Sequence, residues 1–148
     1  MTGAAAGHAR RVFVDTSAWF AVANRRDASH GPAATLMQRL VAERRPLFTT
    51  NFVLAELHAL LLTRLDRRVA ARVLAETDAS ELTTTVRVSA RDERRGREIV
   101  FGFADKDFSL TDASSFAVME RLRIATAFTL DRDFAQFGWT TLGSNERA

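Results

Sequence analysis

The sequence predicts an α/β domain in which a mostly parallel sheet is covered by helices on both faces. The length of 148 residues is that of one compact domain. Short apolar, β-branched segments alternate along the chain with segments of helical periodicity. Helical segments between strands favour right-handed crossovers, which join parallel strands.

In the first half of the chain, apolar residues form short continuous runs in the strands and one face of each helix. Thr16 or Ser17 is the expected N-cap of the first helix, and Asn51 that of the third. Pro46 ends the second helix. The predicted elements are a flexible leader of small residues at 1–10, a strand at 11–15, helices at 17–24 and 33–44, a strand at 47–50 and a helix at 52–65.

The second half continues this alternation. Residues 82–88 (LTTTVRV) alternate with a period of two, which indicates a half-buried strand. Gly96 lies inside a predicted helix although glycine is a poor helix former. The predicted elements are helices at 69–76, 90–101 and 110–122, strands at 82–88 and 125–130, a helical turn at 131–136 and an edge strand at 140–142. We therefore assign residues 11–148 to one domain.

Composition excludes several classes of protein. The absence of cysteine excludes disulfides, thiolate metal sites and cysteine nucleophiles. No apolar run approaches the ~20 residues that span a bilayer, and the N-terminus lacks a secretory signal. We expect a cytoplasmic protein that does not enter a membrane.

Charge is distributed unevenly. The net charge is +3 although the isoelectric point is about 10.8, because the chain has one lysine and no tyrosine or cysteine to titrate above neutrality. The isoelectric point alone therefore does not indicate a nucleic-acid partner. Residues 1–45 carry a net charge of +4, from seven arginines and three acids, and residues 105–133 carry −2, from six acids and four bases. An acidic region in a basic protein indicates a concentrated acidic site.

Several carboxylates are expected near one edge of the sheet. In parallel α/β folds, ligands bind beyond the carboxyl ends of the strands. Asp15 ends the first strand, and Asp131 follows the strand at 125–130, with Asp133 two residues later. Asp112 lies in the first turn of the helix before that strand, and Glu56 in the helix after the second strand. These acids come from distant segments and are expected to converge.

Helix capping is an alternative role for three of these acids. Asp15 and Asp131 each precede a predicted helix or helical turn, where aspartate is a common N-cap. Asp112 follows Ser109 at the spacing of a capping box. Taken singly, each acid fits a cap as well as a functional site.

Glu56 has mainly apolar neighbours at helical spacing, namely Phe52, Val53, Ala59 and Leu60. We therefore expect a buried carboxylate, which needs a cation, a hydrogen-bond donor or a proton. No basic residue lies at helical spacing to pair with it. An exposed glutamate remains the alternative.

As a group, the acids favour a metal site. Neighbouring carboxylates repel one another and retain protons unless a cation joins them. Oxygen ligands without cysteine or suitably spaced histidine favour Mg²⁺ or Mn²⁺. Such ions support phosphate chemistry, because they neutralise a phosphodiester and activate water.

Four segments resemble the PIN-domain ribonucleases, and most closely the VapC-type toxins of bacterial toxin–antitoxin modules. They are FVDTS (13–17), NFVLAEL (51–57), SLTDASSFAVM (109–119) and AFTLDRDFAQFG (127–138), in the same order and at comparable spacing over residues 11–142. The resemblance implies a three-layer α/β/α sandwich around a parallel sheet of about five strands. It also implies metal-dependent endonuclease cleavage of RNA.

The resemblance assigns the catalytic acids to Asp15, Glu56, Asp112 and Asp131. Direct metal contact is expected for Asp15 and Asp112, and for Asp131 directly or through water. Glu56 would bind through water or position the attacking water. Asp133 is the alternative to Asp131 or an auxiliary group.

Further polar residues accompany these acids. Thr16 and Ser17 match the polar pair that follows the family's first acid and are expected to orient it. Asp105 and Asp107 depart from the family pattern, and solvation of a loop explains them better than a role beside the site.

The expected partners are RNA, an antitoxin and a second copy of the chain. Arg25, Arg26, Arg44 and Arg45 are candidates for phosphate contacts. Residues 91–98 interleave arginines with acids, which favours a solvated helix face. The resemblance implies a structured RNA substrate, tRNA or rRNA, a homodimer, and an antitoxin that places an arginine among the acids.

Other acidic α/β folds fit less well. A haloacid-dehalogenase-like phosphatase requires an aspartate where Ser17 stands, and a receiver domain requires a late lysine, whereas Lys106 is the only lysine. No glycine-rich turn follows Asp15, as dinucleotide binding would require. A non-catalytic PIN-like module that binds RNA or protein remains the alternative from another class.

Overall fold

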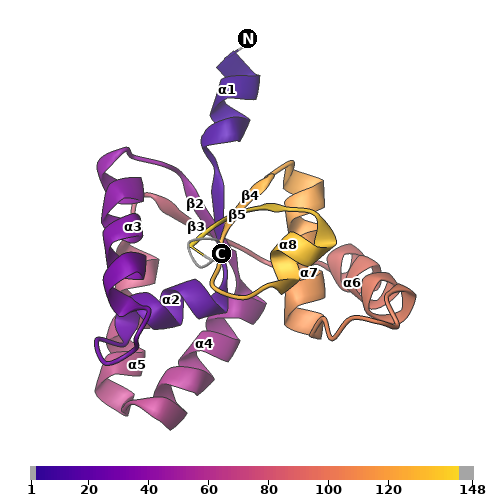
Figure 1. Ribbon diagram of the computed structural model, residues 1–148. Helices are drawn as coiled ribbons and strands as arrows, with labels where there is room; N and C mark the ends of the chain where they lie inside the picture. The colour runs from indigo at the N-terminus through magenta and orange to yellow at the C-terminus, as the bar shows by residue number, and fades with distance from the viewer. Residues whose placement is uncertain (1–2, 144–148) are drawn as a thin grey trace.

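The computed structural model describes residues 3–143, in which five strands form one fully parallel sheet (Figure 1). The strand order is β3-β2-β1-β4-β5, and all four neighbouring pairs are parallel. The predicted α/β fold is therefore confirmed. The strands are β1 (Val12–Val14), β2 (Leu47–Thr50), β3 (Thr83–Val86), β4 (Thr126–Phe128) and β5 (Thr140–Leu142).

Helices cover both faces of the sheet, with α2 to α5 on one side and α6 to α8 on the other (Figure 1). Within the described residues, no helix combines the length and apolar character needed to cross a membrane. The helices are α1 (Gly3–Arg10), α2 (Thr16–Ala23), α3 (His30–Ala42), α4 (Asn51–Arg64), α5 (Arg67–Ala79), α6 (Ala90–Gly102), α7 (Leu110–Leu122) and α8 (Asp133–Phe137).

The central strand β1 is buried on both faces. Phe13 packs against α6, α7 and α8, and its ring lies 6.1 Å from that of Phe134. Val12 and Val14 point to the opposite face and pack against α2 and α3. Burying each of these side chains contributes about 1.5–3 kcal/mol. Asp15, the residue after β1, is thereby held at a fixed point on the carboxyl edge of the sheet.

The N-terminal segment differs from the expected leader without regular structure. Residues Gly3–Arg10 form α1, which projects from the body of the protein (Figure 1). Alanine-rich sequence explains this, because alanine has the highest helix propensity. The Arg45 Nε atom donates a hydrogen bond to the Arg10 carbonyl at 2.7 Å and anchors the end of α1. The division of the chain into a leader and a domain at residue 10 stays a prediction.

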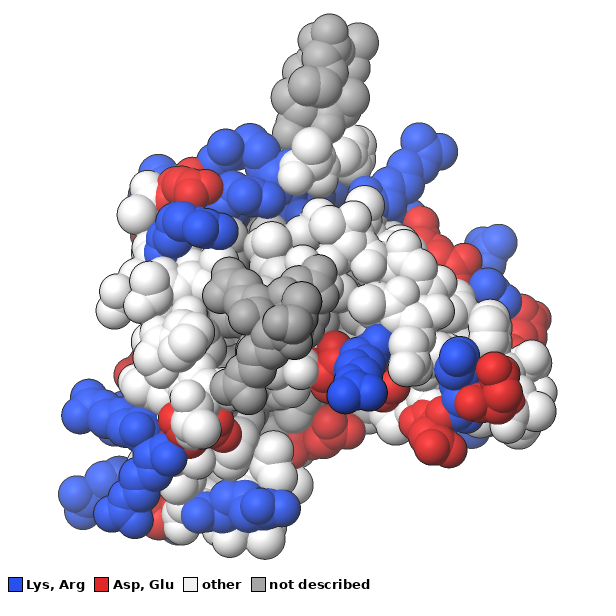
Figure 2. Space-filling view, viewed as in Figure 1, with Lys and Arg blue, Asp and Glu red and all other residues white. Residues whose placement is uncertain are grey.

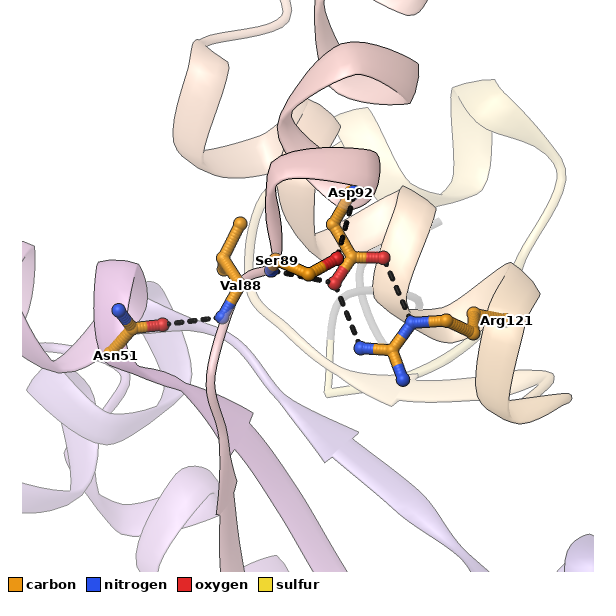
Figure 3. A network of polar contacts seen from close by, with 5 residues as sticks. All are labelled: Asn51, Val88, Ser89, Asp92 and Arg121. Atoms are coloured by element: carbon orange, nitrogen blue, oxygen red, sulfur yellow. Dashed lines mark hydrogen bonds and ion pairs between the residues drawn. The ribbon is translucent and has the colours of Figure 1, made fainter.

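The predicted N-cap of α4 is wrong by one residue. Thr50 is the cap, and its Oγ1 accepts a hydrogen bond from the Val53 amide at 3.1 Å. Asn51 is the first helical residue, and its Oδ1 accepts from the Val88 amide at 2.8 Å (Figure 3). This amide–backbone bond fixes the start of α4 against the connection between β3 and α6.

Helices α6 and α7 pack at unusually short range. A Cβ atom on Gly96 would lie 3.3 Å from the Ser114 amide nitrogen, so glycine permits this approach. Asp92, 3% exposed, accepts two hydrogen bonds from Arg121 at 2.9 and 2.8 Å (Figure 3). This pairing lowers the pKa of Asp92. The expected solvated face is therefore wrong for Asp92, which links the two helices.

Candidate functional site: an acidic cluster at the carboxyl edge of the sheet

Asp15 is oriented by two hydroxyl groups, one from Ser17 nearby in the sequence and one from the distant Thr129. Its Oδ2 accepts hydrogen bonds from Ser17 Oγ at 2.9 Å and from Thr129 Oγ1 at 3.0 Å. Asp15 occupies the N-cap position of α2, in place of the predicted Thr16 or Ser17, but its side chain makes no capping bond. Both hydroxyl donors bind the same carboxylate oxygen, Oδ2.

The two hydroxyls also fix the loop that carries the later acids. Ser17 Oγ accepts a hydrogen bond from the Leu130 amide at 2.9 Å. Thr129 Oγ1 accepts from the Asp131 amide at 3.2 Å. One network therefore positions Asp15 together with the backbone of Asp131. Thr129 was not predicted as a site residue, and its only signal was its place at the end of a strand, two residues before Asp131.

Asp112 combines a capping role with a place in the cluster. Ser109 Oγ accepts from the Asp112 amide at 3.0 Å, and Asp112 Oδ2 accepts from the Ser109 amide at 3.3 Å. The predicted capping box is therefore present. The cap fixes the rotamer of a side chain that is only 9% exposed. Capping and ligand binding are compatible at this residue.

Asp131 and Asp133 both reach the cluster. One carboxylate oxygen from each of Asp112, Asp131 and Asp133 lies within 4.8 Å of the other two. Asp131 Oδ1 also accepts from the Asp133 amide at 2.9 Å, but the N-cap of α8 is Arg132, so the alternative role of Asp131 as that cap is wrong. The sequence left open which of the two aspartates is the fourth acid, and the fold brings both to the same place.

Glu56 is exposed, so the expectation of a buried carboxylate is wrong. Helix α4 buries Val53, Leu57 and Leu61, and Glu56 falls at the side of that face. Its charge nevertheless raises the pKa of Asp131. Glu56 therefore lies close enough to the cluster to act on it from the solvent side.

Burial and mutual repulsion raise the pKa values of the clustered acids. Burial, followed by the charge of Asp131, raises the pKa of Asp15 to about 6, although the two hydroxyl donors oppose the rise. Burial raises the pKa of Asp112, and the charges of Asp15, Asp131 and Asp133 add to it. The pKa of Asp131 is raised mainly by burial. When the acids are ionised, their negative charges repel one another, so the cluster favours binding of a cation.

The donor set fits a hard divalent cation. The clustered ligands are carboxylate oxygens, which suit Mg²⁺ or Mn²⁺. Thr16, 5% exposed, adds a buried hydroxyl whose Oγ1 has no hydrogen-bond partner in the described structure. A buried hydroxyl beside Asp15 with no partner is expected where water or ligand completes a site.

The four arginines predicted to contact phosphate fall into two groups. Arg44 and Arg45 precede β2 and therefore lie at the amino edge of the sheet, opposite the acids. Arg45 there forms an ion pair with Glu43. Arg25 and Arg26 lie in the exposed turn after α2. Figure 2 shows basic side chains around α1 and at the lower left, with acids near the centre.

Comparison with known proteins identifies the family. The PIN domain profile matches residues 12–139. The 23S rRNA-specific endonuclease VapC20 of Mycobacterium tuberculosis, in two strains, is 38% identical over 132 residues, which cover 86% of this chain and 95% of the relative. A crystal structure of that species' VapC20, described as a sarcin–ricin loop cleaving toxin, has a TM-score of 0.78 and 35% identity, covering 87% of this chain and 96% of that one.

A more distant structure shares the fold alone. It is VapBC2 from Rickettsia felis bound to a promoter DNA fragment, with a TM-score of 0.64 and 14% identity, covering 89% of this chain and 97% of that one. The profile match spans the segments that carry Asp15, Asp112, Asp131 and Asp133. The chain therefore belongs to the PIN-domain family.

Proposed function

We propose that this protein is a divalent-cation-dependent endoribonuclease. The observation that carries the proposal is the convergence of Asp112, Asp131 and Asp133 within 4.8 Å, with Asp15 close enough to raise the pKa of Asp112. Four carboxylates at the end of a parallel sheet suit a cation that binds phosphate. Membership of a family of nucleases agrees with this chemistry.

Each acid would have a role in metal binding or in positioning water. Asp15 and Asp112 would hold Mg²⁺ or Mn²⁺, with Asp131 and Asp133 completing the set. When bound, the cation neutralises the phosphodiester and activates water for attack on phosphorus. Glu56, exposed beside Asp131, would position the attacking water. Thr16 would hydrogen-bond to water or phosphate, because its hydroxyl is buried without a partner.

Thr129→Val tests the hydroxyl network. Valine keeps the volume but removes the donor to Asp15 Oδ2 and the acceptor for the Asp131 amide. We expect activity at limiting Mg²⁺ to fall about 10–100-fold, as for other groups that orient metal ligands. Titrating activity against Mg²⁺ measures this. Thr63→Val, on the exposed side of α4, is the control. An unchanged Mg²⁺ requirement in Thr129→Val contradicts the assigned role.

We further propose that the protein is the toxin of a toxin–antitoxin pair that acts in the cytoplasm. Its relative VapC20 is named for cleavage of 23S rRNA, which makes ribosomal RNA the first substrate to test. Within residues 3–143 no lysine or arginine forms an ion pair with the clustered carboxylates, so the acidic cluster would accept an arginine from an antitoxin. Self-association into a homodimer is part of the proposal.

The deciding experiment maps new RNA 5′ ends in cells after induction of the wild-type protein or of Asp15→Asn. We expect one or a few cleavage sites in structured RNA that require Asp15. Purified protein should cut the same RNA with Mg²⁺ or Mn²⁺ but not with EDTA, and should leave a 5′-phosphate and a 3′-hydroxyl. Identical 5′ ends in both cultures, or cleavage that persists in EDTA, would overturn the proposal.

A further inference from the structure

We propose that an arginine patch at the outer end of the α4–α5 hairpin binds the phosphate backbone of the RNA substrate. The inference rests on the proposed ribonuclease function and adds to it a substrate-binding surface outside the acidic cluster. The patch consists of Arg25, Arg26, Arg64, Arg67 and Arg68, all of which are exposed.

Packing brings three segments of the chain together at this point. Ala23 at the end of α2, Leu65 after α4 and Val69 in α5 all pack against the hydrophobic cluster that α4 and α5 form. The arginines flank these three residues in the sequence. Figure 2 shows a dense group of basic side chains at the lower left, over the end of the α4–α5 hairpin drawn in Figure 1.

The patch retains its positive charge. In the part of the chain that the structure describes, none of its five guanidinium groups forms an ion pair, whereas Arg72 pairs with Glu76 and Arg95 with Glu120. The two acids within the patch segments are engaged by backbone amides. Asp27 accepts from the Ser29 amide at 2.7 Å, and Asp66 from the Val69 amide at 2.9 Å.

The stability of helix α5 does not explain two of these arginines. Arg67 and Arg68 occupy the first turn of α5, and that turn contains no acid. The amino end of a helix carries partial positive charge, so cations there are unfavourable. Asp66 caps this helix end, but two cations follow it immediately. Phosphate is a ligand that would compensate both the guanidinium groups and the helix end.

Helix α4 sets the distance between the patch and the acidic cluster. It begins at the carboxyl end of β2 and ends at Arg64, and Glu56, which acts on Asp131, lies in its second turn. Its 14 residues correspond to about 21 Å at 1.5 Å per residue. The patch would therefore contact phosphates several nucleotides away from the cleaved bond. Such contacts strengthen binding without reading sequence.

A pair of double variants tests the patch. R67Q/R68Q removes two patch charges, and the control R94Q/R97Q removes two exposed charges of α6, on the other face of the sheet. Binding is measured in an Asp15→Asn background with a labelled RNA hairpin that contains the mapped cleavage site. We expect R67Q/R68Q to weaken binding roughly tenfold and to reduce the slope of log affinity against log salt by about 1.4. The control should match the parent protein.

Cleavage and folding measurements complete the test. In the active protein, R67Q/R68Q should raise KM and leave kcat unchanged. The contacts that it removes would stabilise the bound substrate and the transition state equally. Its Tm should equal or exceed that of the wild type, since the first turn of α5 loses two unfavourable charges. A lower Tm would mean that the arginines support folding, and would overturn the proposal.

Three outcomes separate this inference from the proposed function. If the wild type cuts RNA but both double variants show the same salt slope, the patch assignment is wrong and the nuclease stands. If R67Q/R68Q changes only self-association in sedimentation experiments, the surface joins copies of the chain and the RNA assignment is wrong. If the wild type cuts no RNA, the proposed function itself fails.

Discussion

Asp112→Asn is expected to lower kcat/KM for RNA cleavage at least about a thousandfold, because it removes a ligand charge that supports several kcal/mol of transition-state stabilisation. The substitution suits the test since it changes charge with little change of shape. The asparagine carbonyl oxygen would still accept the hydrogen bond from the Ser109 amide that completes the capping box. A loss of activity therefore reports on the site rather than on α7.

Asp105→Asn is the matched control. Asp105 lies in the connection before α7, has a side chain that is 78% exposed and forms an ion pair with the adjacent Lys106 at 3.5 Å. This agrees with the expectation that it solvates the loop. Single-turnover cleavage of the mapped RNA at saturating Mg²⁺ measures both variants. Near-wild-type activity in Asp112→Asn, or an equal loss in Asp105→Asn, would contradict the assignment of Asp112.

The second large effect concerns stability, which should fall in the metal-free protein as the pH rises from 5 to 8. Asp15 has a pKa of about 6 in the folded state against 3.8 as its ordinary value, and the pKa of Asp112 is also raised. Between these values the folded protein binds more protons than the unfolded chain. The free energy of unfolding therefore decreases with pH, and for Asp15 alone the part lost between pH 5 and 8 is about 1.4 kcal/mol.

Urea denaturation in EDTA at a series of pH values measures this loss. Asp112→Asn should reduce it and make the metal-free protein more stable than the wild type at pH 8. Mg²⁺ or Mn²⁺ should stabilise the wild type more at pH 8 than at pH 5, because protons compete with the cation. The lowered pKa of Asp92 acts below this pH range and does not obscure the trend. Constant stability from pH 5 to 8 would contradict the raised pKa values of Asp15 and Asp112.

The sequence predicted the location of the site better than its details. Strand periodicity and the rule for parallel sheets placed Asp15 and Asp131 at one edge, and the structure puts them there. The capping box of Asp112 was also readable from spacing. These features depend on local pattern and on topology, both of which a single sequence contains.

Features that depend on tertiary packing were less predictable. Apolar neighbours suggested a buried Glu56, but α4 is covered on only part of its circumference and leaves this residue exposed. Asp92 lies among charged residues typical of a solvated face. Gly96, however, lets α6 approach α7 so closely that Arg121 donates a hydrogen bond to Asp92. In both cases the partner helix, which the local pattern does not specify, decides the environment.

The central position of β1 affects when the protein becomes able to act during its synthesis. This first strand has β4 as one of its two neighbours, so Asp15 acquires the hydroxyl of Thr129 only after most of the chain has been translated. A shorter nascent chain contains Asp15 but lacks the segment with Asp131 and Asp133. The acidic cluster therefore cannot assemble on the ribosome until residue 133 has been synthesised.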